Sequence, residues 1–451
     1  MTRKLFGTDG IRGPANQYPL TADMVLRLGR AAGIALRRGE HLHRVVIGMD
    51  TRRSGDMFES ALRAGFASAG MRCLLASVMP TPGVAFLTRS LRADMGVMIS
   101  ASHNPHYDNG LKFFGPDGMK LADETEIEIE RILFANEPTN GDTLPPEELG
   151  GGTRITGAIE RYIEFCKNVF PSQLTLDGIR LVVDTANGAA YEAAPTILKE
   201  LGADVICINN KPDGININEN AGSLHPEIMA NAVRQHNAHA GLAFDGDADR
   251  LIICDENGSV QDGDSIMAIC ALEMKKQNVL KGGGVVSTVM SNLGLERLLE
   301  HNELSLIRTK VGDRYVLQHM REHDFNFGGE QSGHLIFLDH NTTGDGLVSA
   351  LQVLSVIVGT GKSLSQLCAP LKRVPQVLKN IMVSADADAL AINAVQDSMA
   401  KAEKELGNQG RILVRKSGTE PKIRVMVEGD SLDQINALAD QVLETIRIHA
   451  C

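Results

Sequence analysis

The sequence predicts a multidomain α/β protein, and three observations carry that prediction. With 451 residues, the chain is too long for one ordinary hydrophobic core and suits three or four domains. Up to about residue 370, short apolar runs alternate with helical patterns, which indicates largely parallel sheets with crossover helices. Beyond residue 370 the pattern changes to three strands and two helices, which is typical of a smaller α+β unit with an antiparallel sheet.

The first predicted domain covers residues 1–150. Its elements alternate regularly: strand 45–48, helix 54–69, strand 73–76, a further helix, and strand 95–99. The chain then becomes rich in Asn, Pro, Gly and Glu over residues 136–157, which indicates a domain boundary.

Three more units follow. Residues 151–257 form a second α/β domain, residues 258–370 a third, and residues 371–451 the α+β domain. Their expected strands are 181–184, 204–208, 240–244, a hairpin over 251–260, then 285–288, 305–308, 378–383, 411–414 and 423–427. Their principal expected helices are 189–201, 226–235, a buried helix at 347–358, one ending at 406, and a last helix.

Composition narrows the class of partner. Hydrophobic residues make up 43% and charged residues 22% of the chain, as in ordinary soluble globular proteins. The net charge is −11 and no basic stretch is interleaved with aromatics, so neither nucleic acid nor an anionic membrane is an expected partner. An anionic substrate would therefore need a local cationic pocket.

Cysteine usage and the chain start predict a cytoplasmic location. The seven cysteines are scattered and never form a Cys-x-x-Cys pair, which favours reduced thiols over disulfides or a zinc site. The polar, Gly-rich stretch 6–13 leaves no room for a signal peptide. The apolar stretch 347–358 is too short to span a bilayer. A homodimer is compatible with the sequence, which does not fix the oligomeric state.

Ser102 is the most informative single residue. It follows the buried strand 95–99 and precedes the turn-forming run 105–110, so its hydroxyl lies at the carboxyl end of a strand, where α/β sheets bind ligands. A serine there also suits a simple turn or a helix cap.

Three aspartates form the second signal. Asp245, Asp247 and Asp249 alternate directly after the apolar strand 240–244, and three carboxylates on one turn suit a hard cation such as Mg²⁺. A solvated acidic loop is the plain alternative. An EF-hand is excluded because Arg250 occupies the position that needs Gly and strands flank the loop. Together with Ser102, these residues predict phosphoryl transfer through a phosphoserine.

Two further loops suit a sugar phosphate. The loop 329–334 presents a carboxylate and an imidazole that suit sugar hydroxyls, but on its own it is a weak signal for which an ordinary β-turn is the more common explanation. The loop 415–424 combines hydroxyls, glycine and flanking cations, as an anion-binding nest requires, with a basic hairpin turn as the alternative. The stretch 359–363 is not a P-loop, because Val356 stands where the leading Gly belongs.

Taken together, five motifs resemble the α-D-phosphohexomutase family from end to end, and within it the members that act on glucosamine phosphates. The motifs are residues 6–13, 100–105 with 108–114, 245–250, 329–334 and 415–424. The resemblance implies three related α/β domains with mixed or parallel sheets and a smaller C-terminal α+β domain around a central cleft.

The resemblance also implies residue roles. The implied catalytic residues are Ser102, which carries the phosphate, with Lys112, His334, Arg12 and Arg250 at the reacting centre. The implied ligands of one Mg²⁺ are Asp245, Asp247, Asp249 and the phosphate on Ser102. The implied substrate-binding residues are Glu330, Gln331, Ser332, His334, Arg415, Ser417, Gly418, Thr419 and Arg424. Ala248 stands where many relatives have Gly, which is tolerated unless its φ is positive.

The implied reaction interconverts glucosamine 6-phosphate and glucosamine 1-phosphate through a hexosamine 1,6-bisphosphate, which is both intermediate and activator. It would supply amino-sugar precursors for the cell wall. Lys112 and His334 are both open as the proton carrier. The alternatives are a glucose or mannose phosphate mutase of the same family, and a non-catalytic sugar-phosphate sensor.

Overall fold

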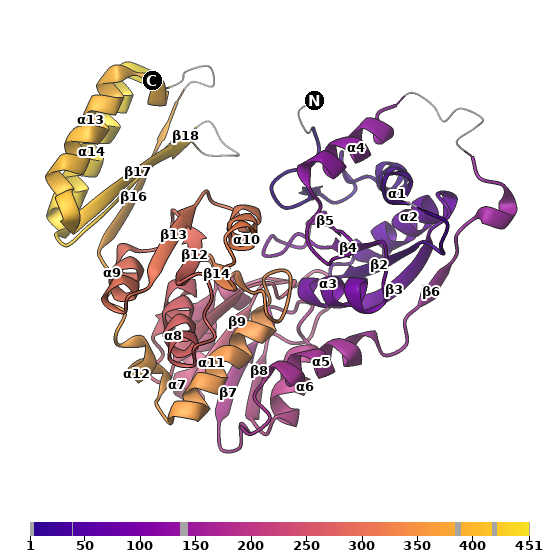
Figure 1. The fold of residues 1–451 in the computed structure, drawn as a ribbon, viewed down its shortest axis with the longest axis horizontal. Helices are drawn as coiled ribbons and strands as arrows, with labels where there is room; N and C mark the ends of the chain where they lie inside the picture. The colour runs from indigo at the N-terminus through magenta and orange to yellow at the C-terminus, as the bar shows by residue number, and fades with distance from the viewer. Residues whose placement is uncertain (1–3, 38, 136–142, 384–388, 417–421, 451) are drawn as a thin grey trace.

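The computed structural model describes residues 4–37, 39–135, 143–383, 389–416 and 422–450. Within these residues the strands form four sheets, and the four units follow one another around an arc (Figure 1). The first and fourth units lie at the two ends of the arc.

The first unit contains a six-stranded mixed sheet in the order β1-β5-β4-β2-β3-β6. Its strands are β1 (Ile11–Pro14), β2 (Arg44–Met49), β3 (Arg72–Val78), β4 (Met95–Ile99), β5 (Asp108–Phe114) and β6 (Gly152–Arg154). Its helices are α1 (Ala22–Leu36), α2 (Gly55–Ser68), α3 (Thr81–Ser90) and α4 (Asp123–Leu133). Strands β2, β3, β4 and β6 are parallel, whereas β5 and β1 add an antiparallel edge.

Alternating side chains of this sheet enter two separate cores. Val45 and Ile47 pack with α1, α2 and α4, whereas Val46 packs with α3 on the opposite face. This two-residue period is what an extended strand buried on both faces requires. The turn-rich run 105–110 only partly forms a turn, because β5 begins at Asp108 and pairs with β1.

The second unit contains a five-stranded mixed sheet in the order β11-β10-β9-β7-β8. Its strands are β7 (Arg180–Asp184), β8 (Asp204–Ile208), β9 (Ala240–Phe244), β10 (Leu251–Asp255) and β11 (Val260–Gln261). Its helices are α5 (Ala158–Val169), α6 (Ala193–Glu200) and α7 (Pro226–His236). Helix α6 begins four residues later than the predicted position 189, because Ala186 and Asn187 have positive φ and the chain still turns there.

The third unit contains a four-stranded mixed sheet in the order β13-β12-β14-β15. Its strands are β12 (Gly284–Thr288), β13 (Ser305–Thr309), β14 (Phe327–Gly329) and β15 (Leu335–Phe337). Its helices are α8 (Gly263–Lys276), α9 (Leu293–His301), α10 (Asp313–Glu322), α11 (Gly346–Thr360) and α12 (Leu364–Cys368). Helix α11 is the predicted buried helix, and it ends at Thr360, directly before Gly361, whose φ of +66° suits a helix C-cap.

The fourth unit is smaller and contains an antiparallel sheet in the order β16-β18-β17. Its strands are β16 (Gln376–Met382), β17 (Gly410–Lys416) and β18 (Lys422–Gly429), and its helices are α13 (Asn393–Leu406) and α14 (Leu432–Ala450). Both helices cover the same face of the sheet (Figure 1). The predicted fold class, with three α/β units and one α+β unit, is confirmed.

The hydrophobic cores divide the molecule unequally. One large cluster runs from the α3 side of the first unit through the second unit into the third, whereas the fourth unit has a core of its own. The first three units are therefore joined by packing that the fourth does not share. None of the helices in the described part of the chain is both long and apolar enough to cross a membrane.

Candidate active site

Ser102 lies in the loop after β4, where its backbone has a φ of +53°. Its side chain is almost completely buried, and its hydroxyl donates a hydrogen bond to Asp245 Oδ2 at 2.5 Å. The Ser102 N–H donates to the hydroxyl of Ser100 at 2.9 Å. The first unit therefore presents this hydroxyl directly to the aspartate turn of the second.

That turn joins β9 to β10 and carries Asp245, Asp247 and Asp249, all of them buried. One ligand oxygen from each of the three lies within 4.8 Å of the other two. Among the described residues, neither Asp247 Oδ1 nor Asp249 Oδ1 accepts a hydrogen bond, although buried carboxylate oxygens ordinarily do, and Asp249 Oδ1 has only ion-pair neighbours at 3.5 Å or more. Three buried oxygen donors with unsatisfied atoms fit Mg²⁺. Ala248, between them, does have a positive φ of +57°, so the turn holds a non-glycine residue in a left-handed conformation.

Electrostatics in the triad point the same way. Burial raises the pKa of Asp245 well above its ordinary value, and the charges of Asp249 and Asp247 raise it further. Lys112 Nζ lies 2.8 Å from oxygens of both Asp247 and Asp249. Burial would lower the pKa of Lys112, but these two carboxylates raise it well above its ordinary value. Lys112 thus offsets part of the negative charge of the three aspartates, and a bound cation would offset the remainder.

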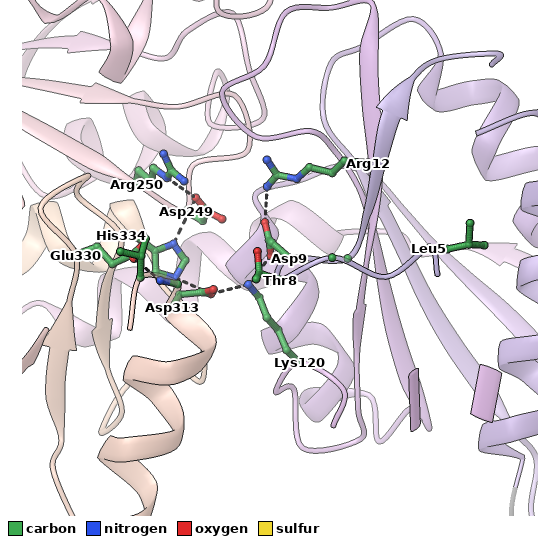
Figure 2. A pocket seen from close by; sticks show the side chains of 14 residues that line it. Leu5, Thr8, Asp9, Arg12, Lys120, Asp249, Arg250, Asp313, Glu330 and His334 are labelled. Carbon is green, nitrogen blue, oxygen red and sulfur yellow. Dashed lines mark hydrogen bonds and ion pairs between the residues drawn. The ribbon is translucent and has the colours of Figure 1, made fainter. Parts of the chain in front are cut away.

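Beside the triad lies a cavity of about 380 Å³ (Figure 2). It is lined by residues of the first three units, namely Leu5, Gly7, Thr8, Asp9, Gly10, Arg12, Lys120, Asp249, Arg250, Val311, Gly312, Asp313, Glu330 and His334. Arg12, Arg250, Glu330 and His334 are therefore brought together, as the resemblance implies. Lys112 does not line the cavity, and it reaches this region through its ion pairs with the aspartates.

His334 lies between two carboxylates. Its Nδ1 is 3.5 Å from Asp249 Oδ1 and its Nε2 is 3.3 Å from Asp313 Oδ2 (Figure 2). Burial would lower its pKa, but these carboxylates raise the pKa to about 10. The Gly344 N–H also lies 3.2 Å from Nε2, which favours a neutral ring, but two carboxylates outweigh one amide dipole. The two carboxylates thus favour the protonated form of the ring.

Three charged residues of the cavity were not predicted from the sequence as site residues: Asp9, Lys120 and Asp313. Lys120 forms ion pairs with Asp9 and, at 2.5 Å, with Asp313 (Figure 2). Asp9 lies inside the motif 6–13, but no local pattern distinguishes it there. Lys120 and Asp313 are 193 residues apart and meet only because the first and third units face each other. Local sequence carries no signal for such a pair.

The predicted sugar loop connects β14 to β15. Glu330 Oε1 accepts a hydrogen bond from the Gly312 N–H at 3.0 Å, and its carboxylate lies at the cavity. Gln331 is turned toward the start of α8, where its Nε2 lies 3.4 Å from Asp264 Oδ2. Ser332 is exposed. The loop therefore presents Glu330 and His334 to the cavity.

The predicted phosphate loop belongs to the fourth unit, and part of it, Ser417, Gly418 and Thr419, lies outside the described residues. Arg415 on β17 and Arg424 on β18 are directly paired across the sheet. Burial and the neighbouring Arg424 lower the pKa of Arg415. Neither arginine lines the cavity. Two like charges placed opposite each other are unfavourable unless an anion lies between them.

Four family models match the chain in order. They describe phosphoglucomutase/phosphomannomutase alpha/beta/alpha domains I, II and III, at residues 3–140, 160–258 and 262–374, and the C-terminal domain at residues 378–445. The chain belongs to the phosphoglucomutase/phosphomannomutase family.

Within this family, the chain is similar over nearly its whole length to relatives named phosphoglucosamine mutase. A phosphoglucosamine mutase of Magnetococcus marinus is 59% identical over 99% of this chain and 92% of its own length. A phosphoglucosamine mutase of Paramagnetospirillum magneticum is 56% identical over 99% of both chains.

Solved structures share the fold. A phosphoglucomutase/phosphomannomutase family protein of Burkholderia thailandensis has a TM-score of 0.82 at 24% identity, with 98% of both chains covered. Aspergillus fumigatus N-acetylphosphoglucosamine mutase, in complex with GlcNAc-6P and magnesium, has a TM-score of 0.67 at 18% identity, with 99% of this chain and 96% of that chain covered.

Proposed function

We propose that this protein is an isomerase with the activity of a phosphoglucosamine mutase, which interconverts glucosamine 6-phosphate and glucosamine 1-phosphate. One observation carries the proposal: Ser102 Oγ lies 2.5 Å from a buried aspartate of a three-aspartate turn, beside a charged cavity. A serine and an oxygen-only metal site in this arrangement suit phosphoryl transfer. Named relatives more than 50% identical over nearly the whole chain support the same activity.

In the proposed reaction, phosphorylated Ser102 transfers its phosphoryl group to O1 of glucosamine 6-phosphate. The bond between Oγ and phosphorus breaks, a new bond forms to O1, and the proton of the sugar hydroxyl is replaced by one delivered to Oγ, so that Ser102 is left as a free hydroxyl. The resulting 1,6-bisphosphate turns around. The bond between O6 and its phosphorus then breaks, the phosphoryl group is transferred to Ser102 Oγ, a proton passes from that hydroxyl to O6, and glucosamine 1-phosphate leaves. The same bisphosphate, entering from solution, would activate unphosphorylated enzyme.

The site residues have two kinds of role in this reaction: some would hold Mg²⁺ and the phosphate in place, and others supply positive charge. Asp245, Asp247, Asp249 and the phosphate on Ser102 would hold Mg²⁺, which supplies charge neutralisation on the transferring group when bound. Arg12 and Arg250 line the cavity and add positive charge beside it. Preorganised charges of this kind stabilise a transition state without reorganisation during the reaction.

Lys112 and His334 both remain candidates for moving the proton of the attacking hydroxyl. Lys112 is buried at the aspartates and His334 lines the cavity. Both are held protonated by neighbouring carboxylates. Either can therefore donate its proton to the leaving oxygen and take up the proton of the attacking hydroxyl in exchange, and geometry with substrate bound would distinguish them.

The sugar-recognition residues in this proposal are Glu330, Gln331, Ser332 and His334, and the phosphate-binding residues are those of the loop 415–424. Glu330 offers a hydrogen-bond acceptor at the cavity. The proposal extends to a cytoplasmic enzyme that supplies amino-sugar precursors for the cell wall.

The deciding experiment is a turnover assay with Mg²⁺ and a trace of a hexose 1,6-bisphosphate. The 6-phosphates of glucosamine, glucose and mannose should be compared at equal concentrations. We expect the largest kcat/KM for glucosamine 6-phosphate. A preference for glucose or mannose would assign a different mutase of the same family. Binding without turnover of any of the three would indicate a sensor.

A further inference from the structure

The backbone carbonyls of Ser102 and Asn104 are each held twice. Arg52 Nη2 donates to Ser102 O at 3.0 Å and to Asn104 O at 2.7 Å. Asn218 Nδ2 donates to the same two oxygens, each at 2.9 Å. We call Arg52, Asn218 and these two carbonyls the carbonyl clamp. Arg52 belongs to the first unit and Asn218 to the second, so the two units grip one loop together.

This loop needs such support because Ser102 has a φ of +53°, a conformation that side-chain-bearing residues rarely adopt. The backbone N–H of Ser102 is held as well as its carbonyl. The Ser100 hydroxyl, which accepts the Ser102 N–H, donates to Asp50 Oδ2 at 2.6 Å. Asp50 Oδ1 in turn accepts the N–H of Arg52 at 2.9 Å. Both polar backbone groups of Ser102 are thus tied to the strand end that carries Arg52.

The clamp is built into the junction between the two units. Arg52 is 2% exposed. A Cβ at Gly246 would come within 2.5 Å of Ser102 O and 2.8 Å of Asn218 Nδ2, so only glycine fits between the aspartate turn and the clamp. The loop of Asn218 is itself anchored, since Asn218 N donates to Ala186 O and Arg53 N donates to Gly214 O, both at 2.9 Å. Asn218 is therefore a fixed part of the second unit.

We propose that Arg52 and Asn218 are positioning residues that hold the Ser102 hydroxyl, and the phosphate it carries, in line with the aspartate turn during both half-reactions. This inference rests on the proposed mutase function. Neither residue needs to contact the substrate: each acts through the backbone of Ser102. Small errors in the position of a reacting group are costly, because catalysis by orientation depends on a near-attack geometry.

The proposal makes a kinetic distinction. Both directions of the reaction use the same phosphoserine, so loss of the clamp should lower kcat in both directions. The sugar is held by other loops, so KM should change little. A merely structural defect would instead lower the amount of folded protein and leave kcat per folded molecule intact.

The principal test is Asn218→Asp, which keeps the shape of the side chain but replaces its N–H donors by a carboxylate oxygen facing two carbonyls. We expect kcat to fall at least tenfold in both directions, with KM for both sugar phosphates and the calorimetric Mg²⁺ affinity within threefold of wild type. Intact-mass analysis after incubation with the bisphosphate should establish that Ser102 is phosphorylated, so that a missing phosphate does not mimic the effect.

Asn216→Asp is the matched control. Asn216 lies two residues away in the same loop. Its side-chain amide donates to Lys211 O and accepts from the Asp213 N–H, and it makes neither of the hydrogen bonds of the carbonyl clamp. It should keep the wild-type kcat. An equal loss in Asn216→Asp would show that the loop is merely sensitive to charge, and would overturn the proposal.

Two further variants keep the test independent of one substitution. Asn218→Ala removes the donors without adding charge, so its loss of kcat should be smaller than that of Asn218→Asp. Arg52→Lys, from the other unit, should also lower kcat with KM unchanged, because one ammonium replaces a planar guanidinium. Wild-type kcat in folded Asn218→Ala and Arg52→Lys would overturn this inference alone. Absence of mutase turnover in the wild-type protein would instead overturn the proposed function.

Discussion

Ser102 is 1% exposed and its hydroxyl is already engaged by Asp245, although the proposed reaction requires it to exchange a phosphoryl group with a sugar. A phosphate on this oxygen would replace the hydrogen bond to Asp245 by a contact between two anions. Such a contact is tolerable only with a cation between them. At the scale of single residues, phosphoserine and metal are therefore interdependent.

Ser102→Ala should consequently abolish mutase turnover while leaving the fold intact. The side-chain hydroxyl donates one hydrogen bond to Asp245 Oδ2, so a change in stability of about 1–3 kcal/mol is expected from the loss of that bond, while Oδ1 keeps its bond from the Arg250 N–H. Phosphopeptide analysis should find phosphate on Ser102 of active wild-type protein. Ser355→Ala, in α11, should keep full activity as the control. Turnover by Ser102→Ala at the wild-type rate would rule out the phosphoserine mechanism.

Asp247→Asn should weaken Mg²⁺ binding by at least tenfold, because it removes one of three charged oxygen ligands. Isothermal titration calorimetry with Mg²⁺ measures this directly. His43→Gln provides the control: His41, His43 and Asp94 form the other described cluster able to hold a metal, and Asp94 precedes β4 whereas Ser102 follows it, so the two sites lie at opposite ends of that strand. Mg²⁺ prefers oxygen ligands, so this variant should bind it normally. A loss of Mg²⁺ affinity in His43→Gln but not in Asp247→Asn would place the magnesium at the cluster of His43 and would contradict the prediction.

At the scale of secondary-structure elements, the pairing of β17 with β18 places Arg415 opposite Arg424 on the face of the sheet that the helices leave uncovered. Arg424 Nε is buried without a hydrogen-bond partner among the described residues. An anion bound between the two arginine side chains would offset their mutual repulsion and would accept a hydrogen bond from Arg424 Nε. The strand register thus supplies a physical reason to assign phosphate binding to this sheet.

Arg424→Ala should therefore raise KM about tenfold or more in both directions of the isomerisation. A charge-assisted hydrogen bond contributes roughly 1.5–3 kcal/mol, which corresponds to that change in affinity. Lys379→Ala is the matched control, since Lys379 lies on β16 of the same sheet but pairs with Asp440 of α14 on the covered face. Steady-state kinetics from each sugar phosphate decide the matter. A defect in one direction alone would show that the two half-reactions do not share this phosphate site.

The start of α8 contains a second unusual carboxyl. Burial, with the nearby Asp262 charge, raises the pKa of Asp264 to about 7 from 3.8. Because the folded protein binds this proton more tightly than the unfolded chain, stability is lost as pH rises from about 4 to about 7. The full effect of such a shift is about 4 kcal/mol.

Asp264→Asn should remove this loss. At pH 8 we expect its free energy of unfolding to exceed that of wild type by roughly 1–4 kcal/mol, with the two proteins converging near pH 4. Urea unfolding at several pH values measures it. Asp397→Asn, an exposed position within α13, serves as the control and should follow the wild-type curve. Equally steep pH dependence in Asp264→Asn would assign the effect to another group.

The elements also show what could be predicted from the sequence. Strand and helix patterns located most elements, because burial on one or both faces leaves a period that a single segment displays. Ser102 and the aspartate turn were identifiable because each follows a buried strand directly. Asp9, Lys120 and Asp313 were not, because their ion pairs form between units and leave no local trace. The carbonyl clamp was hidden for the same reason: Asn218 is 116 residues from Ser102.

At the scale of the whole molecule, the cavity lies among the first three units, whereas the proposed phosphate-binding arginines lie in the fourth, and the contacts between units differ in kind. The first three units share one hydrophobic cluster, whereas the fourth meets the third through polar contacts. Asn292 donates to Val374 O and to Glu428 Oε1, each at 3.0 Å. Arg411 donates to Ser291 O at 2.6 Å. A joint made of directional hydrogen bonds can be rearranged at lower cost than a packed core, so domain movement is the default expectation there.

This joint leads to the last prediction, that substrate closes the molecule. Described residues of the first three units line the cavity, but Arg415 and Arg424 do not, and Figure 1 shows the fourth unit at the far end of the arc from the first. A sugar phosphate that contacts both the cavity and the two arginines must bring the fourth unit inward.

Small-angle X-ray scattering should then show a smaller radius of gyration when glucosamine 6-phosphate and Mg²⁺ are added to Ser102→Ala protein, which binds without turning over. The double variant Arg415→Ala/Arg424→Ala, in the same Ser102→Ala background, should keep the open dimensions at the same substrate concentration, because the anion no longer has a partner in the fourth unit. Equal contraction in both proteins would show that closure does not depend on these arginines. No contraction in either, at concentrations where calorimetry shows binding, would mean that the fourth unit does not move toward the cavity when substrate binds.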